Sequence, residues 1–508
     1  MKLAFRVDFA PSIGMGHIRR CLTLADEALR LGHQSNFVLS SIDSYSADLI
    51  ADRGHTVTRI PFTPSSPWNL KNNPNWSDPN LIADERADAT ASIVVLDSYR
   101  PDFVILDHYF MTQRWIDLLK SSVSARFVVL EDLDRLWNQT DYLVNGNLDA
   151  KVTLSESSRA RVLLGPRYAF LSREYREIRA ANILPVENRQ RILVFAGGGN
   201  STDLTAKFLR AASRLQLGID VVASSASSNL GELARQVALT RTATLHLDLP
   251  TLGPLYAQAR LALGAGGTSS WERACLGVPS LVTSVAENQV SVCEALSHHG
   301  LAKYIGPSDE LDELQLDVTL QELFESPAEL KEMSTTGMRL VDGFGTTRTL
   351  FAMMGKPETG VLRKARKADA AILHDWVNDP DVIRNSKSQR VIPWGDHESW
   401  FRTTLTNGDC QIFVLEISGL PVGQIRFDRK EEHLVLTYSI DRDFRSQGLG
   451  KFIVEQGLRA MSKQGSQMVE AMVRQENTAS ARVFVRLGFM PSPSEDEEYL
   501  RFITKVGD

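Results

Sequence analysis

A histidine that follows two glycines is the first position at which this sequence could do chemistry. The segment GMGHIRRCLTLA (14–25) places Gly14, Gly16 and His17 after an apolar, strand-like run and before an amphipathic, helix-like pattern. Glycines let a ligand approach the backbone, and a helix N-terminus offers free N–H groups and partial positive charge. Histidine has an ordinary pKa of ~6.5, so it can accept a proton as a general base. The pattern predicts either a base beside a bound ligand or a turn that His17 only caps.

A second chemical signal is the loop rich in glycine and hydroxyl groups within GAGGTSSWERACLGVPSLVTSVAENQ (264–289). It joins a strand-like run to a helix-like one, which favours a diphosphate held by backbone N–H groups and hydroxyls. Glu272 could accept hydrogen bonds from both ribose hydroxyls, or it could be the first-turn acid of a capped helix. A polar cluster at the end of the next strand favours the ligand site. The predicted substrate-binding residues are Gly266, Gly267, Thr268, Ser269, Ser270, Glu272, Glu287, Asn288 and Gln289.

The third signal is RSQGLGK (445–451), between the strand-like HLVLTYSI and a helix-like stretch. Its glycines remove side chains from the path of an anion, and successive amides at a helix N-terminus suit a pyrophosphate. Asn477 opens the last helix-like segment, either as a helix cap, as a hydrogen-bonding group of the site, or as both. The predicted cofactor-binding residues of the loop are Arg445, Ser446, Gln447, Gly448, Leu449, Gly450 and Lys451.

These sites need elements to position them, and 508 residues exceed the ~250–300 at which a single core stops growing. Through about residue 345, β-rich and helix-like runs alternate, which predicts a doubly wound α/β fold. The charged stretch 172–190 predicts a joint between two lobes, and GKPETG (355–360) a linker. Beyond it, a strand, two Trp-rich helices, a hairpin turning at SGLP and further elements predict an α+β domain with a largely antiparallel sheet. The predicted boundaries are 1–180, 181–354, 355–360 and 361–508.

Composition excludes several classes of function. The net charge of −6 and pI near 6.0 provide no field that would attract nucleic acid or an anionic membrane. Four cysteines lie far apart, which predicts reduced thiols rather than disulfides or a zinc ribbon. Arg6 and Asp8 interrupt the first apolar run, and no segment approaches the ~18 apolar residues of a membrane span. We therefore expect a cytoplasmic protein, and the sequence leaves its oligomeric state open.

Several ordered motifs in the first 345 residues carry a family resemblance. GMGHIRRCLTLA, PDFVILDHY, LLGPRYAFLSREY and GAGGTSSWERACLGVPSLV with AENQ resemble the UDP-sugar hydrolases of pseudaminic acid synthesis. That family is related to the N-acetylglucosaminyltransferase of peptidoglycan synthesis, so the resemblance implies a two-lobed glycosyltransferase-B-like fold. It also implies hydrolysis of UDP-2,4-diacetamido-2,4,6-trideoxy-β-L-altropyranose to free sugar and UDP. Water would attack the anomeric carbon, and no metal would be required.

The resemblance assigns roles motif by motif. His17 becomes the catalytic base or water-orienting residue, and Asp107 and Tyr109 of the DHY motif join it in the cleft. Substrate contacts are implied for Gly14, Gly16, Arg20, Asn288 and Gln289.

Two departures from the family pattern bear on the contacts. Glu131 stands where the family commonly begins a pair of Asp residues, and AGGGNST (196–202) replaces a GGSD-like loop. The alternative for this half is a glycosyltransferase that acts on a separate acceptor.

From residue 361 onward, the order of elements and the RxxGxG loop resemble the GNAT-superfamily N-acetyltransferases. In that family the loop holds the pyrophosphate of acetyl-CoA, so the resemblance implies acetyl-CoA as cosubstrate. An amine would attack the thioester directly, while a strand amide near Ser439 or Ile440 polarises the acetyl carbonyl. Asn477 receives a catalytic role, and the LGF turn (487–489) closes the fold.

Phe484 departs from the GNAT pattern because many members have a tyrosine there that protonates the leaving thiolate. Water, Tyr438 or Tyr499 are the alternative proton donors, or the thiolate leaves unassisted.

The segments WVNDPDVIRN and VIPWGDHESWF resemble the sugar-amine acetyltransferases of the pseudaminic acid pathway. Trp394, His397 and Trp400 form either a platform for a nucleotide-sugar or ordinary core packing.

The two resemblances assign neighbouring steps to one chain. The second half would acetylate the 4-amino group of UDP-4-amino-4,6-dideoxy-N-acetyl-β-L-altrosamine, and the first half would then release UDP. The product is the precursor of a nonulosonic acid found on flagellin and bacterial surface polysaccharide. The alternative is that one half has lost catalysis and only binds its nucleotide, with Phe484 making the acetyltransferase half the first suspect.

Overall fold

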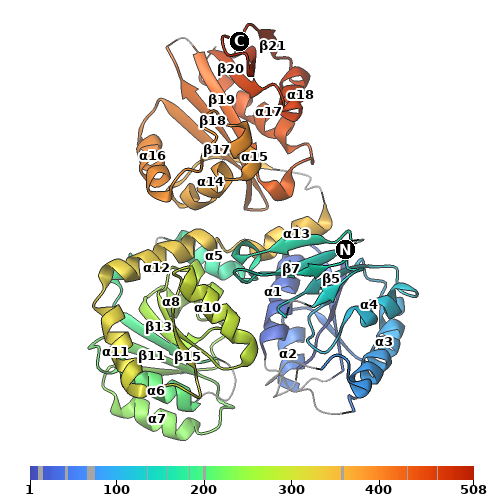
Figure 1. Ribbon diagram of the computed structural model, residues 1–508, viewed down its shortest axis with the longest axis vertical. Helices are drawn as coiled ribbons and strands as arrows, with labels where there is room; N and C mark the ends of the chain where they lie inside the picture. Colours follow the sequence, from blue (N-terminus) through green and yellow to red (C-terminus); the bar gives the residue numbers. More distant parts are fainter. Residues whose placement is uncertain are drawn as a thin grey trace. The chain divides into compact units, whose positions relative to one another are not determined.

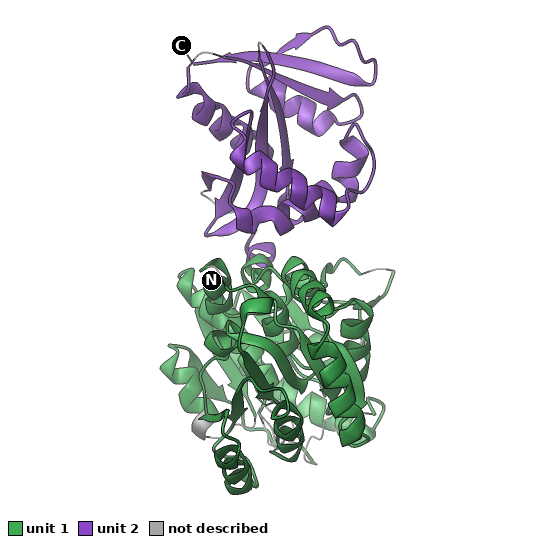
Figure 2. Ribbon diagram, turned by 90° about the vertical axis from the view of Figure 1, so that its left-hand side faces the viewer, with its two compact units in different colours: residues 1–350 green, residues 351–508 purple. Residues whose placement is uncertain are grey.

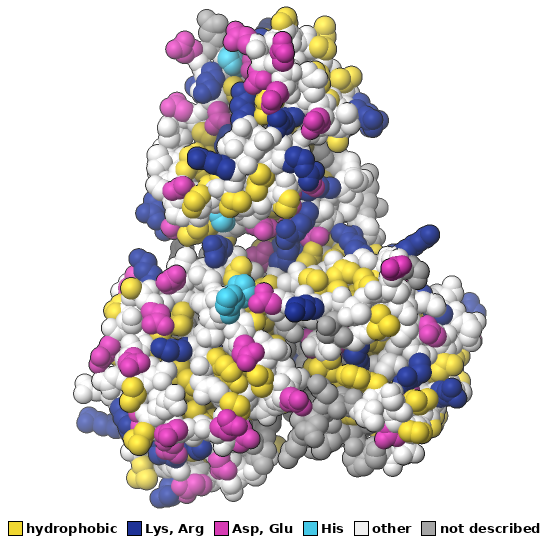
Figure 3. Space-filling model, in the orientation of Figure 1, with side chains coloured by type: hydrophobic (Ala, Val, Ile, Leu, Met, Phe, Trp, Pro, Cys, Tyr) yellow, Lys and Arg dark blue, Asp and Glu magenta, His cyan; other side chains and the backbone are white. Residues whose placement is uncertain are grey.

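The chain folds into two compact units, Met1–Leu350 and Phe351–Asp508 (Figure 2). They are described from a computed structural model. The structure describes residues 1–9, 15–40, 44–65, 75–133, 135–156, 158–181, 183–197, 202–355, 360–431, 433–465 and 467–507. None of the helices within these ranges combines the length and apolar character that crossing a bilayer requires. On the face that Figure 3 shows, acidic and basic side chains are mixed, as the small net charge leads us to expect.

The first unit begins with a lobe built on a parallel sheet. Its strands are β1 (Lys2–Arg6), β2 (Gln34–Leu39), β3 (Thr56–Arg59), β4 (Phe103–Leu106), β5 (Arg126–Leu130), β7 (Tyr142–Asn145) and β9 (Arg161–Leu164). They lie in the order β3-β2-β1-β4-β5-β7-β9, and all neighbours run parallel. The sequence order reverses between β1 and β4, which leaves a crevice at their carboxyl ends. The short β6 (Leu136–Trp137) and β8 (Thr153–Leu154) pair separately.

Helices cover both faces of this sheet. Figure 1 shows α1 and α2 on one side and α3 and α4 on the other. The helix α1 is amphipathic because Ile18, Cys21, Leu22 and Ala25, spaced at helical intervals, are all buried. The helical elements of this part are α1 (Gly16–Arg30), α2 (Ser44–Asp52), α3 (Pro79–Tyr99), α4 (Gln113–Lys120), η1 (Pro166–Tyr168), α5 (Arg173–Ala180) and η2 (Val186–Asn188).

The second lobe repeats the doubly wound design. Its strands are β10 (Arg191–Phe195), β11 (Gly218–Ala223), β12 (Ala243–Leu247), β13 (Ala259–Ala265), β14 (Ser280–Ser284) and β15 (Lys303–Pro307). They form a parallel sheet in the order β12-β11-β10-β13-β14-β15, so the switch point lies between β10 and β13. Its helical elements are α6 (Thr202–Ala212), α7 (Leu230–Leu239), α8 (Gly253–Tyr256), α9 (Ser269–Cys275), η3 (Glu287–Gln289), α10 (Val290–His298), α11 (Glu313–Phe324) and α12 (Pro327–Leu340).

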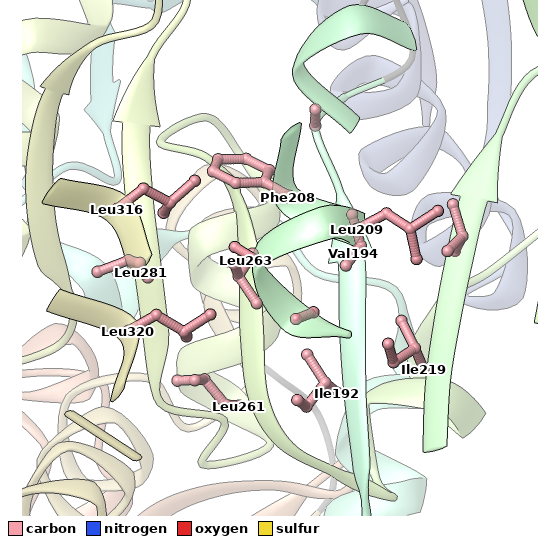
Figure 4. Close-up of a cluster of buried hydrophobic side chains, with 14 of the residues drawn as sticks. Ile192, Val194, Phe208, Leu209, Ile219, Leu261, Leu263, Leu281, Leu316 and Leu320 are labelled. Carbon is pink, nitrogen blue, oxygen red and sulfur yellow. The ribbon is translucent and has the colours of Figure 1, made fainter. Parts of the chain in front are cut away.

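One face of this second sheet carries a large apolar core. Figure 4 shows Ile192, Val194, Leu261 and Leu263 of the central strands in one cluster with Phe208 of α6. Leu316 and Leu320 of α11 close the same core. The lobe is therefore a rigid base for the loops at its switch point.

The helix α13 (Gly345–Met354) returns from the second lobe to the first. Thr346 Oγ1 donates to the Leu171 carbonyl, and Thr347 Oγ1 donates to Glu27 of α1 at 2.6 Å. These contacts join residues far apart in sequence, so the end of the first unit stabilises its beginning.

The second unit is an α+β domain around a mixed sheet in the order β16-β17-β18-β19-β20-β22-β21. Its neighbours are antiparallel except for the parallel pair β19 and β20. The strands are β16 (Val361–Lys364), β17 (Cys410–Ile417), β18 (Leu420–Arg429), β19 (His433–Ile440), β20 (Gln467–Arg474), β21 (Met490–Ser492) and β22 (Tyr499–Val506). The helical elements are η4 (Lys367–Asp369), α14 (Ala370–Val377), α15 (Pro380–Asn385), α16 (Trp394–Thr406), η5 (Arg442–Phe444), α17 (Leu449–Ser462) and α18 (Thr478–Arg486).

The predicted fold classes of both units are confirmed, with one local correction. The sequence predicted two Trp-rich helices after the first strand, but α15 is a third helix between α14 and α16. It forms because the Asp379 side chain accepts from the Asp381 and Val382 amides while Pro380 occupies the first turn. The predicted hairpin is present as β17 and β18, turning at Ser418 and Gly419, whose φ angles are 49° and 83°. Residues 356–359 of the predicted linker lie outside the described ranges.

The turn after β13 gives a first testable consequence. A methyl group on Gly266 would collide with Cys293 Sγ, whereas one on Gly267 would meet only Gln289 Nε2 at 3.8 Å. We expect Gly266→Ala to lower the free energy of unfolding by about 1–3 kcal/mol, while Gly267→Ala leaves it nearly unchanged. Denaturant titration of the full chain would measure both.

The collision itself can be tested by removing its partner. Because Cys293→Ala deletes the clashing sulfur, the double variant with Gly266→Ala should be more stable than the sum of the two single changes predicts. Simple additivity would show that Gly266 is not held by this contact.

Candidate functional site

The densest group of polar side chains lies at the switch point of the first lobe, where α1 begins beside the end of β4. His17 is 8% exposed, and its Nδ1 lies 2.6 Å from Oδ1 of Asp107. Arg20, one turn along α1, donates to both oxygens of the same carboxylate, from Nε at 2.9 Å and from Nη2 at 2.5 Å. No described residue hydrogen-bonds to Nε2 of His17. A carboxylate that holds Nδ1–H leaves Nε2 as the basic nitrogen, so this pair can take a proton from a ligand or water.

A second carboxylate extends the cluster toward the other lobe. Asp132, just after β5, accepts from Nη1 of Arg20 at 2.7 Å and from the hydroxyl of Tyr109 at 3.1 Å. The Tyr109 ring contacts His17 edge to face, with 4.4 Å between ring centroids. Asn288 of η3, in the second lobe, donates from Nδ2 to the same hydroxyl at 3.3 Å. The cluster therefore contains side chains of both lobes.

The charges of the cluster stabilise one another. Burial alone would raise the pKa of Asp107, but Arg20 and His17 hold it well below its usual range. Arg20 has a raised pKa because both carboxylates outweigh its burial. Burial, with Asp132, raises the pKa of Tyr109 well above its ordinary value, which keeps its hydroxyl protonated. An ionised Asp107 is the state that can stabilise a protonated His17.

The structure describes some, but not all, of the predicted residues around this cluster. Gly16 begins α1, and a methyl group there would meet nothing within 4 Å. Gly14 lies outside the described residues. The structure brings the side chains of Asp107, Tyr109, His17 and Arg20 together.

Beneath the cluster lies a buried network that no motif had indicated. Arg6 of β1 pairs with Asp88 of α3 and donates to Asp8 at 2.7 Å. His108 Nε2 lies 3.2 Å from Asp8, and Trp115 Nε1 donates to Asp88 at 2.8 Å. The two charged residues that interrupt the first apolar run thus form part of a buried ion network at the switch point.

The two acidic residues after β5, Glu131 and Asp132, have different roles. Glu131 is fully buried and accepts from Nε of Arg135 at 2.9 Å and from the Trp137 indole at 2.5 Å. Arg135 in turn donates to the carbonyls of His108 and Tyr109 at 3.0 and 3.1 Å. Glu131 therefore shapes the loop, and its neighbour Asp132 joins the site. Sequence reasoning missed Asp132, although its place directly after a parallel strand is a usable signal.

The predicted loop of the second lobe follows β13 and leads into α9. Ser269 and Ser270 are the first residues of α9, and Thr268 precedes them. Ser270 Oγ accepts from Nη2 of the buried Arg273, which also donates to the Ala265 carbonyl, so this hydroxyl faces the protein. Gln289 Oε1 accepts from the Val285 amide, and Glu287 is exposed in the same turn. Asn288 is the member of this polar cluster that reaches the first lobe.

Glu272 of α9 is partly buried. Burial raises its pKa, while a hydrogen bond with the Tyr175 hydroxyl and the charge of Arg19 oppose that rise. Arg19 belongs to α1 and Tyr175 to α5, so Glu272 also connects parts of the chain that are distant in sequence.

The predicted pyrophosphate loop of the second unit has the backbone shape that such a site needs. Ser446 and Gly448 both have left-handed φ angles, 62° and 82°, directly before α17. Gly450 lies against Tyr438, because a methyl group there would come within 3.4 Å of its hydroxyl. The turn presents the amides of Gln447 through Lys451 at the start of a helix of 14 residues. Leu449 begins that helix and its side chain is buried.

The side chain of Arg445 is engaged elsewhere. It forms ion pairs with Asp379 and Asp381 of the α15 turn, each at 2.7 Å, and its Nε donates to the Ile440 carbonyl. Arg445 therefore fixes the loop against α15, and the loop's amides are the groups available to an anion.

A gap in strand pairing supplies the second half of this site. β19 pairs with β20 only over His433–Leu436, whereas Thr437–Ile440 pair with β18 on their other side. The edge of β19 at Ser439 and Ile440 is therefore unpaired toward β20. Such an edge can hold an extended, amide-bearing cofactor arm as an added strand would be held. Sequence reasoning had located the residues but not the gap.

The remaining predicted residues of the second unit lie around this gap. Asn477 is the cap of α18, since its Oδ1 accepts from the Ser480 amide at 3.1 Å. Phe484 is buried against Phe489 and Phe502, which makes it a core residue. The Tyr438 hydroxyl lies 3.1 Å from Ser480 Oγ.

Tyr499 is only 7% exposed, and two cations lie near its ring. Lys387 and Arg474 lie over its ring at 5.4 and 5.6 Å from the centroid.

The Trp and His cluster of α16 combines core packing with a surface. His397 is 3% exposed, stacks on Phe401 with 5.9 Å between centroids and lies 3.0 Å from the Ala370 carbonyl. Trp400 is 40% exposed, and the Arg426 guanidinium lies 5.5 Å from its ring centroid. His397 therefore belongs to the core, whereas Trp400 is exposed and Trp394 is half-buried, so these two are the parts of the predicted platform that a ligand could reach.

No group of three or more His, Cys, Asp and Glu side chains within the described ranges is arranged to hold a metal ion.

Fold and site geometry define a two-lobed α/β region of the glycosyltransferase-B type followed by a GNAT acetyltransferase domain. Residues 361–490 match the family described as "Acetyltransferase (GNAT) domain", which uses acetyl-CoA. Among solved structures, a spermidine N-acetyltransferase of Vibrio cholerae is 13% identical over 29% of this chain and 95% of that chain, with a TM-score of 0.27.

The first unit is similar to a protein whose name refers to polysaccharide biosynthesis. The spore coat polysaccharide biosynthesis protein SpsG of Bacillus subtilis is 25% identical over 259 residues, 50% of this chain and 76% of that protein. MurG of Acinetobacter baumannii is 12% identical over 70% of this chain and 99% of that chain, with a TM-score of 0.49. An uncharacterized protein of Methanocaldococcus jannaschii is 19% identical over 96% of either chain, so the two regions occur together in a second protein.

The buried His397 gives a pH-dependent prediction for the acetyltransferase unit. Burial, and then the neighbouring His374, lower the pKa of His397 to about 4, against ~6.5 when unfolded. Between pH ~6.5 and pH 4, His397 is protonated in the unfolded chain but not in the folded one. The stability that is present above pH ~6.5 is therefore lost as the pH falls toward 4. The loss attributable to His397 should be up to about 3 kcal/mol.

Hydrogen exchange of peptides from this unit, measured on the full chain between pH 7 and 4.5 after correction for intrinsic rates, would follow that loss. His397→Gln should flatten the pH dependence, while His433→Gln at a partly exposed position should keep it. An equally steep dependence in His397→Gln would contradict the assignment.

Proposed function

We propose that this chain is a bifunctional enzyme of pseudaminic acid synthesis in the cytoplasm. Its second unit acetylates UDP-4-amino-4,6-dideoxy-N-acetyl-β-L-altrosamine with acetyl-CoA. Its first unit hydrolyses the resulting UDP-2,4-diacetamido-2,4,6-trideoxy-β-L-altropyranose to free sugar and UDP. The observation that carries the hydrolase half is the His17–Asp107 pair at the switch point, completed by Asn288 from the other lobe.

The hydrolase step needs a base, a bound diphosphate and access for water. Nε2 of His17 takes a proton from water while the water oxygen bonds to the anomeric carbon. The bond from that carbon to the diphosphate oxygen breaks, and UDP leaves with its electron pair. Asp107 stabilises the imidazolium that forms, and a positioned base of this kind is worth ~10²–10⁴-fold in rate.

The second lobe is proposed to bind the UDP part of the substrate. Gly266, Gly267 and Thr268 bring backbone amides to the end of β13, where a diphosphate can approach. Glu272, on the same helix, is proposed to receive the ribose hydroxyls. Glu287, Asn288 and Gln289 line the neighbouring strand end, so the sugar would lie between them and His17.

The acetyl-transfer step uses the loop 446–451 and the open edge of β19. The loop amides bind the pyrophosphate of acetyl-CoA, and the amide near Ser439 or Ile440 polarises the thioester carbonyl. The substrate amine attacks the carbonyl carbon, its nitrogen loses a proton to water, and the carbon–sulfur bond breaks. Tyr438 is the proposed donor of a proton to the thiolate, because its hydroxyl lies beside both Gly450 and Ser480. Burial raises its pKa, which keeps that proton in place.

The hydrolase assignment predicts a separation of the two activities. His17→Ala should reduce UDP release by ~10²-fold or more while acetyl transfer continues, so acetylated UDP-sugar accumulates. Mass spectrometry of purified protein with UDP-4-amino-4,6-dideoxy-N-acetyl-β-L-altrosamine, with and without acetyl-CoA, would measure both products.

His299→Ala is a suitable control because His299 is a partly exposed residue outside the cluster. It should leave both rates unchanged. If the unaltered protein acetylates the UDP-sugar but never releases UDP, the first unit is not this hydrolase. Transfer of the sugar to an added acceptor would then favour a glycosyltransferase.

The acetyltransferase assignment predicts different effects for two buried tyrosines. Tyr438→Phe should lower kcat of acetyl transfer by ~10²-fold with little change in KM for acetyl-CoA, since it removes only the proton donor. Tyr499→Phe should have a small effect. Steady-state kinetics of free CoA release would measure both, and equal kcat values for the two variants would exclude Tyr438 as the acid.

A further inference from the structure

Asp132 connects more partners of the first site than any role in binding would require. Its two oxygens accept from Nη1 of Arg20 at 3.0 and 2.7 Å, and one of them also accepts from the Tyr109 hydroxyl at 3.1 Å. Nδ2 of Asn147 lies 3.4 Å from the other oxygen. Its side chain is 18% exposed, so it lies at the rim of the cluster.

Arg20 links the position of Asp132 to that of the base, His17. Its guanidinium donates to Asp132 from one nitrogen and to Asp107 from the other two. Because a guanidinium is planar and its donors have fixed directions, the place of one carboxylate sets the place of the other. Asp107 then holds Nδ1 of His17 at 2.6 Å.

Tyr109 links Asp132 to the second lobe. A hydroxyl has one proton to donate and lone pairs that accept. Tyr109 gives its proton to Asp132 and accepts from Nδ2 of Asn288 at 3.3 Å. Asn288 lies in η3, next to the proposed diphosphate-binding loop.

We propose that Asp132 is a positioning residue that couples the second lobe to the catalytic base, through Tyr109 to Asn288 and through Arg20 and Asp107 to His17. The inference rests on the proposed function of the first unit. With Asn288 engaged on Tyr109, as in the structure, this chain of contacts holds His17 against Asp107.

Removing the charge of Asp132 has a definite effect on His17. Among the described residues, the charged and titratable groups around His17 are Asp107, Arg20 and Tyr109, with the Cys21 thiol against Asp107 and Asp132 behind Arg20. Asp132→Asn removes one negative charge and leaves Arg20 compensated by Asp107 alone. A protonated His17 becomes less favourable, so the pKa of the base moves down.

The test compares Asp132→Asn with Asp149→Asn. Asp149 makes a second contact between the lobes, with His299 at 2.9 Å, but lies outside the cluster. Asn also tolerates the left-handed backbone at Asp149, where φ is 51°. Asp132→Asn should lower kcat for UDP release ~10-fold or more with KM within ~3-fold, and should move the acidic limb of the kcat/KM profile to lower pH. Asp149→Asn should change neither.

A double variant tests the coupling between Asp132 and the second lobe. Asn288→Ala should lower kcat in the unaltered protein but have little further effect in Asp132→Asn, because both variants interrupt one chain of contacts. Losses that multiply would overturn the coupling.

A substrate-free measurement separates this inference from the proposed function. NMR of the full chain with ¹³C-labelled histidine, in which the His17 signal is assigned by its absence in His17→Ala, gives the pKa of His17 directly. A lower pKa in Asp132→Asn but not in Asp149→Asn supports the connection, even if the protein were to release no UDP. An unchanged pKa and an unchanged pH profile would overturn it.

Discussion

A buried carboxylate, Asp107, is the constraint around which the first unit is arranged. It is 1% exposed, so its charge is stable only while Arg20 and His17 stay within hydrogen-bond distance. Both partners lie on the first turns of α1, and Asp107 lies directly after β4. The sheet must therefore place the start of α1 beside the end of β4. Strand order 3-2-1-4 does this, because it makes β1 and β4 neighbours.

The same constraint explains the second layer of charge beneath the site. The Arg6 network with Asp8 and Asp88 lies under the carboxyl ends of these two central strands, where a hydrophobic core would otherwise continue. A buried ion network with one arrangement fixes where β1 ends relative to α3 and β4. The apolar core lies deeper in the lobe, and this polar layer separates it from the His17 cluster.

The sequence predicted the reacting groups better than their supports. His17, Asp107 and Tyr109 follow strand-like runs, and the carboxyl ends of parallel strands meet at one edge, so their proximity was predictable. Asp132 was not, because nothing in the letters Glu131-Asp132 shows which carboxylate turns inward. The return of α13 to the first lobe could not be predicted either, since Thr346 and Thr347 bind partners 175 and 320 residues away in the sequence. The short strands β6 to β9 contain too few residues for a period of two to be recognised.

The unpaired edge of β19 is a feature of the second unit that likewise could not be predicted from the sequence. A glycine loop before a helix is a local pattern, but a gap between two parallel strands depends on where their pairing stops. Pairing between β19 and β20 stops after Leu436, although β20 continues to Arg474 and pairs with β22 along its other edge. The open edge and the loop before α17 both follow from β19, which ends only a few residues before the loop begins. One strand thus positions both the amides proposed for the thioester and those proposed for the pyrophosphate. That shared origin is why Arg445, which holds the loop to the Ile440 carbonyl, matters to both.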